Sequence, residues 1–370
     1  MEVVMTREEL CAKRYEALEA FGHIGNPTYC APYGNGHIND TFLVICESKK
    51  RYILQRINHS IFTNPQEIME NICAVTDFIR KKSAEIGADT ERCTLSVVKT
   101  LSGESFYQDS IGSYWRLYDF TERTVTKEKV SNIKEFYDCA EAFGKFQAQL
   151  AEFDASSLHE AIKDFHNTPM RFANLLRAIE NNPLGRVAEV GPEIKFALER
   201  EEFTKTLEKA HAEGRLPLRV THNDTKLNNI LFDEHTGSPV CVIDLDTVMP
   251  GYSVNDFGDS IRFGANTAAE DETNLSKVSL DLELYRAYTE GFLRGCDGRL
   301  TSSEIELLPI GAIMMTLECG LRFLTDYIEG DVYFRISRPS HNLDRCRTQF
   351  ALVADMEKNL DSMKIGNYKV

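Results

Sequence analysis

The chain has 370 residues, of which 42% are hydrophobic and 27% charged, and its formal net charge is −15. This length is long for one hydrophobic core and suits two lobes or domains. The acidic balance argues against a nucleic-acid binder, which normally presents a basic face to the phosphate backbone. It is compatible with a cationic small substrate, and equally with an ordinary enzyme of the cytoplasm.

No run of the sequence approaches the roughly 18 consecutive apolar residues that span a bilayer, so no membrane partner is expected. The first 22 residues are charged and helical in pattern, unlike a secretory signal. The ten cysteines never come closer than 16 residues apart and form no C-x-x-C pair, which argues against a structural zinc site. Such spacing is typical of reduced thiols and predicts a cytoplasmic location.

The N-terminal part has the pattern of a small sheet with one long helix. Short runs rich in β-branched and aromatic residues, bounded by turn residues, predict strands. These runs are 41–45, 51–55, 95–98 and 113–120. Between them, apolar residues recur every three or four positions over 65–86, which predicts an amphipathic helix.

Beyond residue 122 the pattern changes to long amphipathic helices. The clearest covers 133–152, and others lie near 193–212, 281–294 and 303–330. A β-rich segment, 219–246, interrupts them. We therefore expect an α+β protein with a small β-rich N-terminal lobe, 1–122, and a larger, mainly helical C-terminal lobe, 123–370.

The β-rich segment carries the chemistry. It reads VTHNDTKLNNILF, a turn, and a second strand that ends at Asp244. Asp224 can orient an acceptor hydroxyl and take its proton. Asn229 and Asp244 offer hard oxygen ligands for Mg²⁺, and Lys226 can reach a transferring phosphoryl group. Phosphoryl transfer asks for this combination of positioning and charge neutralisation.

The H-x-D-x-x-x-x-N…D pattern resembles the catalytic core of protein kinases and of aminoglycoside phosphotransferase-like kinases. No Ala-Pro-Glu segment or activation loop follows Asp244, which favours the small-molecule branch. More specifically, four segments resemble the bacterial N-acetylhexosamine 1-kinases, over about residues 30 to 350. These segments are 33–39, 219–231, 257–264 and 318–324.

The resemblance implies a two-lobed, protein-kinase-like fold and a defined reaction. ATP with Mg²⁺ would phosphorylate the anomeric C1 hydroxyl of N-acetylglucosamine or N-acetylgalactosamine. It further implies that a glycine-rich turn, Gly34, Asn35 and Gly36, lies over the ATP phosphates, where missing side chains let backbone amides approach. His37 and Asn39 would touch phosphate or sugar, or only brace the loop. Backbone groups near Phe120 would bind the adenine edge.

One position departs from the kinase pattern. Kinases commonly carry a Lys or Arg on the strand after the glycine loop, and this chain has Gln55 there. Arg56 should face the opposite side of the strand. Glu67 and Glu70 on the next helix are candidate acidic partners or simply solvated residues. Because the group that contacts the α- and β-phosphates stays open, a nucleotide-binding pseudokinase remains an alternative.

For the acceptor, the resemblance points to Arg322 and Tyr333, a planar cation and an aromatic ring suited to a sugar. A structural ion pair between Arg322 and Glu318, one helical turn earlier, is the alternative. Asp246 would line the pocket or support the metal. A separate set is expected only to hold the catalytic loop in place: Asp256, Asp259 and His222.

A kinase of the same fold for an aminoglycoside, choline, homoserine or another sugar is the nearest rival interpretation. The sequence leaves the preference between gluco and galacto epimers and between nucleotides open. With no interaction tail, a monomer is the default expectation.

Overall fold

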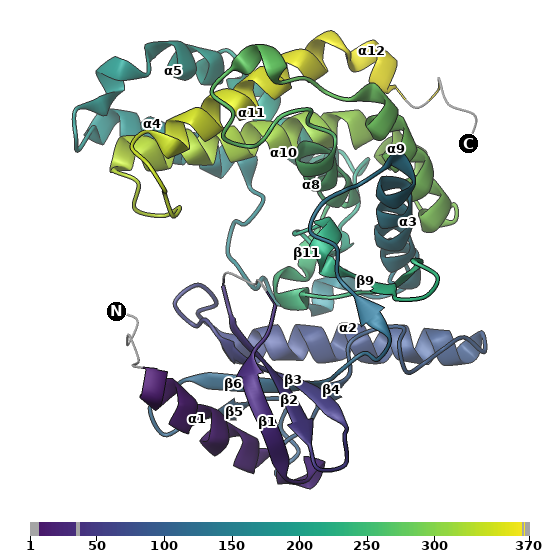
Figure 1. Ribbon diagram of the computed structural model, residues 1–370. Coiled ribbons are helices and arrows are strands. Elements are labelled where there is room, and N and C mark those ends of the chain that lie inside the picture. The colour runs from purple at the N-terminus through teal and green to yellow at the C-terminus, as the bar shows by residue number, and fades with distance from the viewer. Residues whose placement is uncertain (1–6, 35–37, 365, 367–370) are drawn as a thin grey trace. The chain divides into compact units, whose positions relative to one another are not determined.

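A computed structural model describes residues 7–34, 38–364 and 366, and the chain divides into two compact units (Figure 1). Unit 1 comprises Met1–Val125, Ser156–Lys163 and Leu231–Met249. Unit 2 comprises Thr126–Ala155, Asp164–Ile230 and Pro250–Val370.

The main sheet of unit 1 has the strand order β1-β2-β3-β6-β4, with β5 also paired to β6. All of these pairs are antiparallel. The strands are β1 (Pro27–Pro32), β2 (Asp40–Cys46), β3 (Arg51–Ile57), β4 (Val97–Val98), β5 (Tyr107–Gln108) and β6 (Tyr114–Asp119). The predicted strands at 41–45 and 51–55 correspond to β2 and β3, and 113–120 contains β6.

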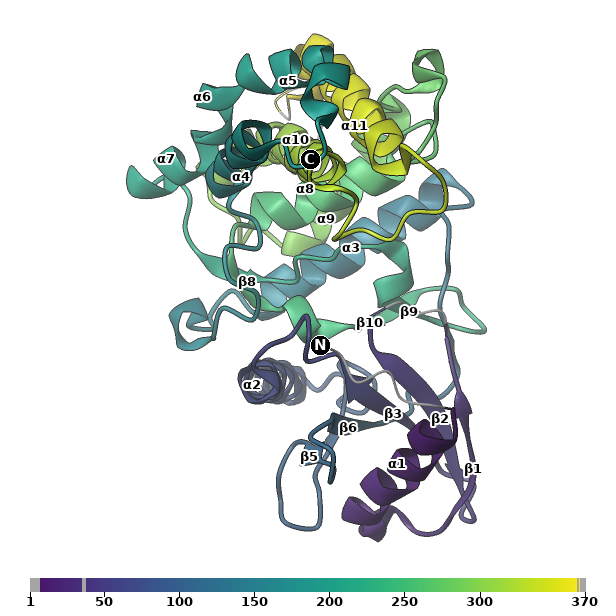
Figure 2. The same cartoon turned by 90° about the vertical axis from the view of Figure 1, so that its left-hand side faces the viewer.

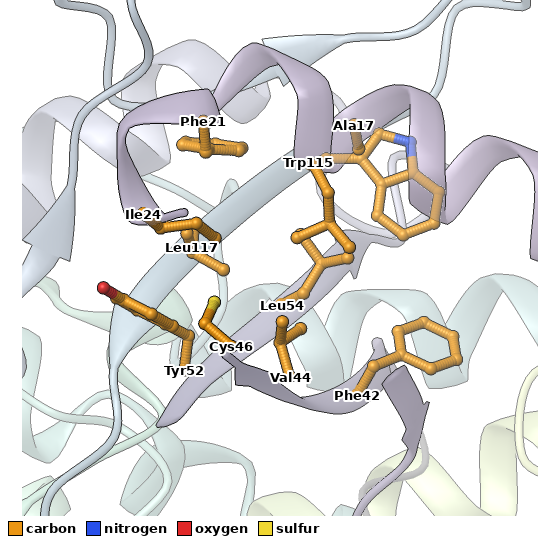
Figure 3. Close-up of a cluster of buried hydrophobic side chains, with 11 residues drawn as sticks. Ala17, Phe21, Ile24, Phe42, Val44, Cys46, Tyr52, Leu54, Trp115 and Leu117 are labelled. Carbon is orange, nitrogen blue, oxygen red and sulfur yellow. The ribbon is translucent and has the colours of Figure 1, made fainter. Parts of the chain in front are cut away.

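Side chains alternate between the two faces of this sheet, because a strand has a period of two. One face packs against α1 (Arg7–Ala20) in an apolar cluster that includes Phe42, Leu54 and Trp115 (Figure 3). The other face, which carries Arg116, is met by Met69 of α2 (Pro65–Glu85). The polar face of the sheet therefore lies beneath a helix rather than in the apolar cluster.

Unit 1 also recruits chain from later in the sequence. β7 (Thr124–Val125) pairs with β9 (Ile230–Asp233), which in turn pairs with β10 (Pro239–Val242). Asn71 of α2 donates to the carbonyl oxygen of Val248 (3.0 Å) and to that of His159 (2.8 Å). The chain thus re-enters unit 1 twice, which the expected division into 1–122 and 123–370 did not include.

Unit 2 is mainly helical, and its long helix α10 packs against α4, α8 and α11, while α3 packs along α9 (Figures 1 and 2). Its larger helices are α3 (Ile133–Gln149), α4 (Thr168–Asn181), α8 (Ser253–Gly264), α9 (Leu282–Cys296), α10 (Ser302–Glu329) and α11 (His341–Lys358). The predicted helix at 193–212 is three shorter helices: α5 (Gly191–Leu198), α6 (Glu201–Thr204) and α7 (Thr206–Ala212).

The remaining elements are short. They are α12 (Leu360–Met363), β8 (Arg219–Thr221), β11 (Met249–Gly251), and 3-10 turns at Gly22–Ile24, Ala155–Ser157, Arg186–Glu189, Leu227–Asn229, Leu245–Thr247 and Leu275–Lys277. β8 pairs with β11.

By length and composition α10 could cross a membrane, but 83% of its most apolar 18-residue window is buried within the fold. Its hydrophobicity is accounted for by its neighbours. A side chain on Gly311 would fall onto the carbonyl oxygen of Val254 in α8, and one on Gly258 onto the carbonyl oxygen of Gly311. Both glycines are therefore required by the close approach of two helix backbones, as in a core helix pair.

Candidate active site

Asp224 lies in the loop that follows β8, with both carboxylate oxygens engaged. Oδ1 lies 2.6 Å from Nζ of Lys226, and Oδ2 accepts a hydrogen bond from Nδ2 of Asn229 (3.0 Å). The Asp224 side chain nevertheless remains 26% exposed. The arrangement fixes the direction of a carboxylate that an acceptor hydroxyl can still reach, as a general base requires.

The catalytic loop is held by buried groups of unit 2. The carboxylate of Asp256 accepts the backbone N–H groups of His222 (2.9 Å) and Asn223 (2.7 Å) and the side-chain amide of Gln147 (2.8 Å). Burial raises the pKa of Asp256, although these donors oppose the shift. Nδ1 of His222 accepts the N–H of Asp224 (3.3 Å). Asp256 and His222 therefore brace the loop, as expected.

A second carboxylate, Asp259, supports the same loop. It accepts the N–H of Thr225 (3.2 Å) and binds the guanidinium group of Arg262 (2.9 Å). Burial alone would raise the pKa of Asp259, but Arg262 and Lys226 hold it below its usual range. Burial alone would lower the pKa of Lys226, but Asp224 raises it, so Lys226 is a cation at neutral pH.

Asn229 is oriented by its donors. Its side-chain amide nitrogen donates to the backbone oxygen (2.8 Å) and to Oδ2 (3.0 Å) of Asp224, two acceptors that only the nitrogen can satisfy. Oδ1 accepts no hydrogen bond from the residues that the structure describes. The residue is 5% exposed, and an amide oxygen beside a carboxylate fits the oxygen ligands that Mg²⁺ prefers.

In unit 1, Asp244 and Asp246 follow β10 and differ sharply in surroundings. Asp244 is exposed and adopts φ 60°, a left-handed conformation that is uncommon for a residue other than glycine. Such conformations cluster at ligand sites. Asp246 is 3% exposed, and Arg116 binds both of its carboxylate oxygens. Asp244 is thus the more accessible carboxylate of the pair.

The cation missing at position 55 lies on the neighbouring strand. Gln55 on β3 is paired with Arg116 on β6, and Oε1 of Gln55 accepts a hydrogen bond from Nε of Arg116 (2.9 Å). Arg56 binds Asp40 (2.6 Å) on the other side of β3, as the pleat predicts. Glu70 is bound to Gln66 and His159 instead of acting as a partner at position 55.

The glycine-rich turn is described only in part, since Asn35, Gly36 and His37 lie outside the described residues. Gly34 adopts φ 76°, which glycine tolerates without strain. The Asn39 side chain donates to Oδ2 of Asp246 (2.6 Å) and accepts the N–H of Asn58 (2.9 Å), so it braces unit 1. Its role toward phosphate or sugar stays a prediction.

Phe120 follows β6 directly, at the expected hinge. Its N–H donates to the carbonyl oxygen of Arg51 (3.2 Å), and the guanidinium carbon of Arg51 lies 4.1 Å from its ring centroid. The ring also meets Tyr33 edge to face, with the centroids 6.0 Å apart. The residue is therefore held at the end of β6 against the start of β3, and adenine binding by its backbone stays a prediction.

Arg322 on α10 stands among aromatic rings of unit 2. Its guanidinium carbon lies 5.9, 5.7 and 5.2 Å from the ring centroids of Phe165, Tyr333 and Phe334. Nη2 is 3.4 Å from the Tyr333 hydroxyl. Glu318, the alternative ion partner, is instead bound to His166 (2.9 Å) and Thr168. The structure brings Arg322 and Tyr333 together, and their role toward an acceptor stays a prediction.

A second arginine, Arg171 on α4, joins this group, because its Nη2 donates to the carbonyl oxygen of Phe165 (2.9 Å). Burial lowers the pKa of Arg171, and the nearby positive charge of Arg322 lowers it further. Its Nε is buried and has no hydrogen-bond partner among the described residues. Two adjacent guanidinium groups, one with an unsatisfied donor, favour an oxygen-rich ligand.

The aromatic group is tied to both the loop that carries Tyr333 and the catalytic loop. Buried Asp326 accepts the N–H groups of Tyr333 (2.7 Å) and Phe334 (2.9 Å), which fixes that segment. His166, bound to Glu318, also lies 3.4 Å from the carbonyl oxygen of Asn223, next to Asp224. Unit 2 therefore connects the predicted acceptor residues with Asp224, the predicted base, through a short chain of contacts.

Residues 30–290 match the phosphotransferase enzyme family. The chain belongs to this family. It is the family of aminoglycoside phosphotransferase-like small-molecule kinases, whose acceptors are alcohols. The chain is therefore a small-molecule kinase, and the expected two-lobed α+β, kinase-like fold is confirmed.

Solved structures of low sequence identity share the fold of this phosphotransferase. A microcompartment-associated aminopropanol kinase is 14% identical with a TM-score of 0.56, over 94% of this chain and 98% of that one. An ethanolamine kinase from Plasmodium vivax is 13% identical with a TM-score of 0.57, over 94% and 91% of the two chains. An amicoumacin kinase is 13% identical with a TM-score of 0.56, over 94% and 96%.

The amicoumacin kinase structure contains AMP-PNP and Ca²⁺, and kinases of this family use ATP and a divalent metal ion. In the phosphotransferase described here, no cluster of three or more His, Cys, Asp or Glu side chains that could hold a metal occurs within residues 7–34, 38–364 and 366. The metal ligands predicted from the sequence, Asn229 in unit 2 and Asp244 in unit 1, stay a prediction.

Sequence reasoning missed three residues of this phosphotransferase: Arg116, Arg171 and His166. Each acts through a partner distant in sequence, respectively Asp246, Arg322 and Glu318. Only for Arg116 was a signal present. It lies at even spacing from Tyr118 and Tyr114 on a predicted strand, so it faces away from the apolar Trp115 and Leu117.

Proposed function

We propose that this phosphotransferase transfers the γ-phosphoryl group of MgATP to the anomeric C1 hydroxyl of an N-acetylhexosamine. The observation that carries the proposal is the pair of guanidinium groups, Arg171 and Arg322, which both contact Phe165, beside the Tyr333 ring. A positively charged pair repels a cationic acceptor and attracts the carbonyl oxygen of an acetamido group and ring hydroxyls. The resemblance of four sequence segments to N-acetylhexosamine 1-kinases supports the same acceptor.

In the proposed mechanism, Asp224 orients the C1 hydroxyl and accepts its proton as the bond to phosphorus forms. Lys226, held 2.6 Å from Asp224, offsets negative charge on the transferred group. Asn229 and Asp244 are the proposed ligands of Mg²⁺, which when bound neutralises charge on the phosphate oxygens. Asn229 directly precedes β9 and Asp244 follows β10, two neighbouring strands joined by a short turn, which supports a shared metal.

The second candidate function is phosphorylation of an amino alcohol. It is favoured by the acceptors named for two structures of the same fold, aminopropanol and ethanolamine kinases, and by the net charge of −15. A cationic acceptor needs nearby carboxylates or aromatic faces. Glu318 and Asp326, each four positions from Arg322 on α10, already accept hydrogen bonds from other groups. The aromatic faces nearby are already taken by the Arg322 guanidinium group, so local charge favours the sugar.

An acceptor panel tests the proposal. ADP release with MgATP is measured for N-acetylglucosamine, N-acetylgalactosamine, glucose, galactose, aminopropanol, ethanolamine, choline and kanamycin, with phosphorus NMR of each product. We expect turnover of the N-acetyl sugars and an anomeric phosphate signal. Turnover restricted to amino alcohols would overturn the acceptor assignment, and nucleotide binding without turnover would favour a pseudokinase.

A matched pair of variants localises the effect. Arg322→Gln should raise KM for the N-acetyl sugar by about tenfold, the loss of one charge-assisted interaction, and leave KM for MgATP unchanged. Arg200→Gln removes another unit 2 arginine that lies over a ring, Phe196 (3.4 Å), and should leave both constants unchanged. Equal effects of the two substitutions would argue against a specific acceptor site at Arg322.

A further inference from the structure

Each of the three side-chain nitrogens of Arg116 is engaged inside unit 1. Nε donates to Gln55 (2.9 Å), Nη2 donates to Oδ2 of Asp246 (2.9 Å), and Nη1 binds Oδ1 of Asp246. Arg116 is 1% exposed and Asp246 is 3% exposed. The contact is therefore a buried, bidentate salt bridge.

Stability alone does not account for such a pair. Removing two charges from water costs several kcal/mol per ion, and an apolar pair of similar volume is often as stable or more so. A buried ion pair does, however, define one geometry, because a planar guanidinium group fits a carboxylate in a single orientation. The question is what this geometry serves.

The answer lies in the segment that Asp246 belongs to. Asp246 is in the 3-10 turn Leu245–Thr247, which begins directly after Asp244 with its left-handed φ of 60°. Asn39 donates to Oδ2 of Asp246 (2.6 Å), and Asn71 donates to the carbonyl oxygen of Val248 (3.0 Å). The turn is thus anchored from β6, from the residue before β2 and from α2.

We propose that Arg116 is a positioning residue for the metal ligand Asp244, acting through its ion pair with Asp246. It provides from β6 the buried cation that position 55 on β3 lacks. Because the three side-chain nitrogens of Arg116 are engaged by Gln55, Asp246 and the sulfur of Met69, and the side chain is 1% exposed, it holds the turn in place and does not bind the nucleotide. The inference rests on the assignment of Asp244 under the proposed function.

The experiment compares the full-length wild type with Arg116→Lys, which keeps the charge but loses the fork, and with Arg116→Met. Mn²⁺ binding in the presence of AMP-PNP is followed by electron paramagnetic resonance, and the unfolding temperature is measured without ligands. Amide exchange of 244–248 is measured without metal. The control is Arg56→Met, which removes the ion pair between Arg56 and Asp40 on the opposite side of β3.

We expect Arg116→Lys to stay folded, to bind Mn²⁺ about tenfold more weakly and to exchange the amides of 244–248 faster. KM for the acceptor should change less than twofold. Arg116→Met should weaken Mn²⁺ binding at least as much. If Asp246 were itself a metal ligand in competition with Arg116, Arg116→Met would instead bind Mn²⁺ as tightly as the wild type or more tightly.

Wild-type Mn²⁺ affinity in folded Arg116→Lys or Arg116→Met would overturn the inference, as would an equal loss in Arg56→Met. Asp244→Asn separates the positioning role of Arg116 from the assignment of Asp244 as a metal ligand. If Asp244→Asn loses Mn²⁺ binding while the Arg116 variants retain it, only the positioning role of Arg116 is refuted. Retention in Asp244→Asn would refute the metal assignment of the proposed function.

Discussion

At the scale of single residues, the side chains of the candidate site are held in defined orientations by their hydrogen-bond partners. Asp224 is bound at one oxygen by Lys226 and at the other by Asn229. The same contacts that fix its direction also hold Asn229 with its oxygen available. Asp224, the proposed base, therefore also orients Asn229, the proposed metal ligand.

Replacement of Asp224 by Asn should lower kcat by about 10²- to 10⁴-fold, because the amide keeps the shape but cannot accept a proton. The dissociation constant for AMP-PNP, measured by calorimetry, should stay within about twofold. Asp297→Asn serves as the matched control, since Asn tolerates its left-handed φ of 49°. Near-normal turnover of the Asp224 variant would contradict its role as the base.

The residues that could be predicted are those whose relation is local in sequence. Asp224, Lys226 and Asn229 lie within six positions, so one motif carries their geometry. Arg116 and Arg171 could not be assigned in the same way. The partner of Arg116 depends on strand register and on a segment that arrives 130 residues later, and that of Arg171 depends on the packing of α4 near α10.

At the scale of elements, α10 organises unit 2. It is capped at its start by Thr301 and Glu304 and ended by Gly330 at φ 109°. Along its length it contributes Glu318, bound to His166 and Thr168, and Arg322 among the aromatic rings. Burial alone would lower the pKa of His166, but Glu318 outweighs it and raises that pKa above 6.5.

This pair gives a pH dependence with a defined sign. A histidine whose folded pKa exceeds its unfolded value of 6.5 contributes stability below pH 6.5, and that contribution is lost as pH rises through the folded pKa. Glu318→Gln should therefore cost about 3 kcal/mol at pH 6 and clearly less at pH 9, in urea unfolding. Glu329→Gln, at the exposed end of the same helix, should cost nothing at either pH. A destabilisation by Glu318→Gln that grows with pH would contradict an ion pair between His166 and Glu318.

Elements with a clear period were predicted, and those without one were not. α3 and α9 show a repeated apolar face, and β2 and β3 alternate. In α8, nine of twelve residues are buried, including Asp256 and Asp259, so polar residues occur where a helix pattern would require apolar ones. Those carboxylates are buried because the catalytic loop supplies their donors, and no sequence period could have announced this.

At the scale of the whole molecule, unit 1 is assembled from three separate stretches of chain. The stretch Leu231–Met249 brings β10, Asp244 and Asp246, and it provides the partners of β7 and Arg116. A boundary near residue 122 therefore separates sequence patterns but not the units that pack. The change of pattern was readable, whereas the return of the chain depends on strand pairing across more than 100 residues.

A fragment of residues 1–125 should accordingly fail to fold cooperatively. It leaves Arg116 buried without Asp246, at a cost of several kcal/mol that is comparable with the stability of a whole domain. Thermal unfolding followed by circular dichroism should show no sharp transition, in contrast to the full chain. The same fragment with Arg116→Met should recover part of the transition. A cooperative transition in the unaltered fragment would show that Leu231–Met249 is dispensable for unit 1.

The late arrival of Leu231–Met249 also matters while the protein is being made. After Val125 has been added, another 105 residues (126–230) must be synthesised before Leu231 appears. At bacterial or eukaryotic ribosome speeds this takes about 5 to 20 s, far longer than a small sheet needs to collapse. During that interval the sheet exposes the guanidinium group of Arg116 and the unpaired edge of β7, because the residues that pair with them have not been synthesised. Nascent chains of this phosphotransferase should therefore depend on chaperones between these two points of translation more than before or after them.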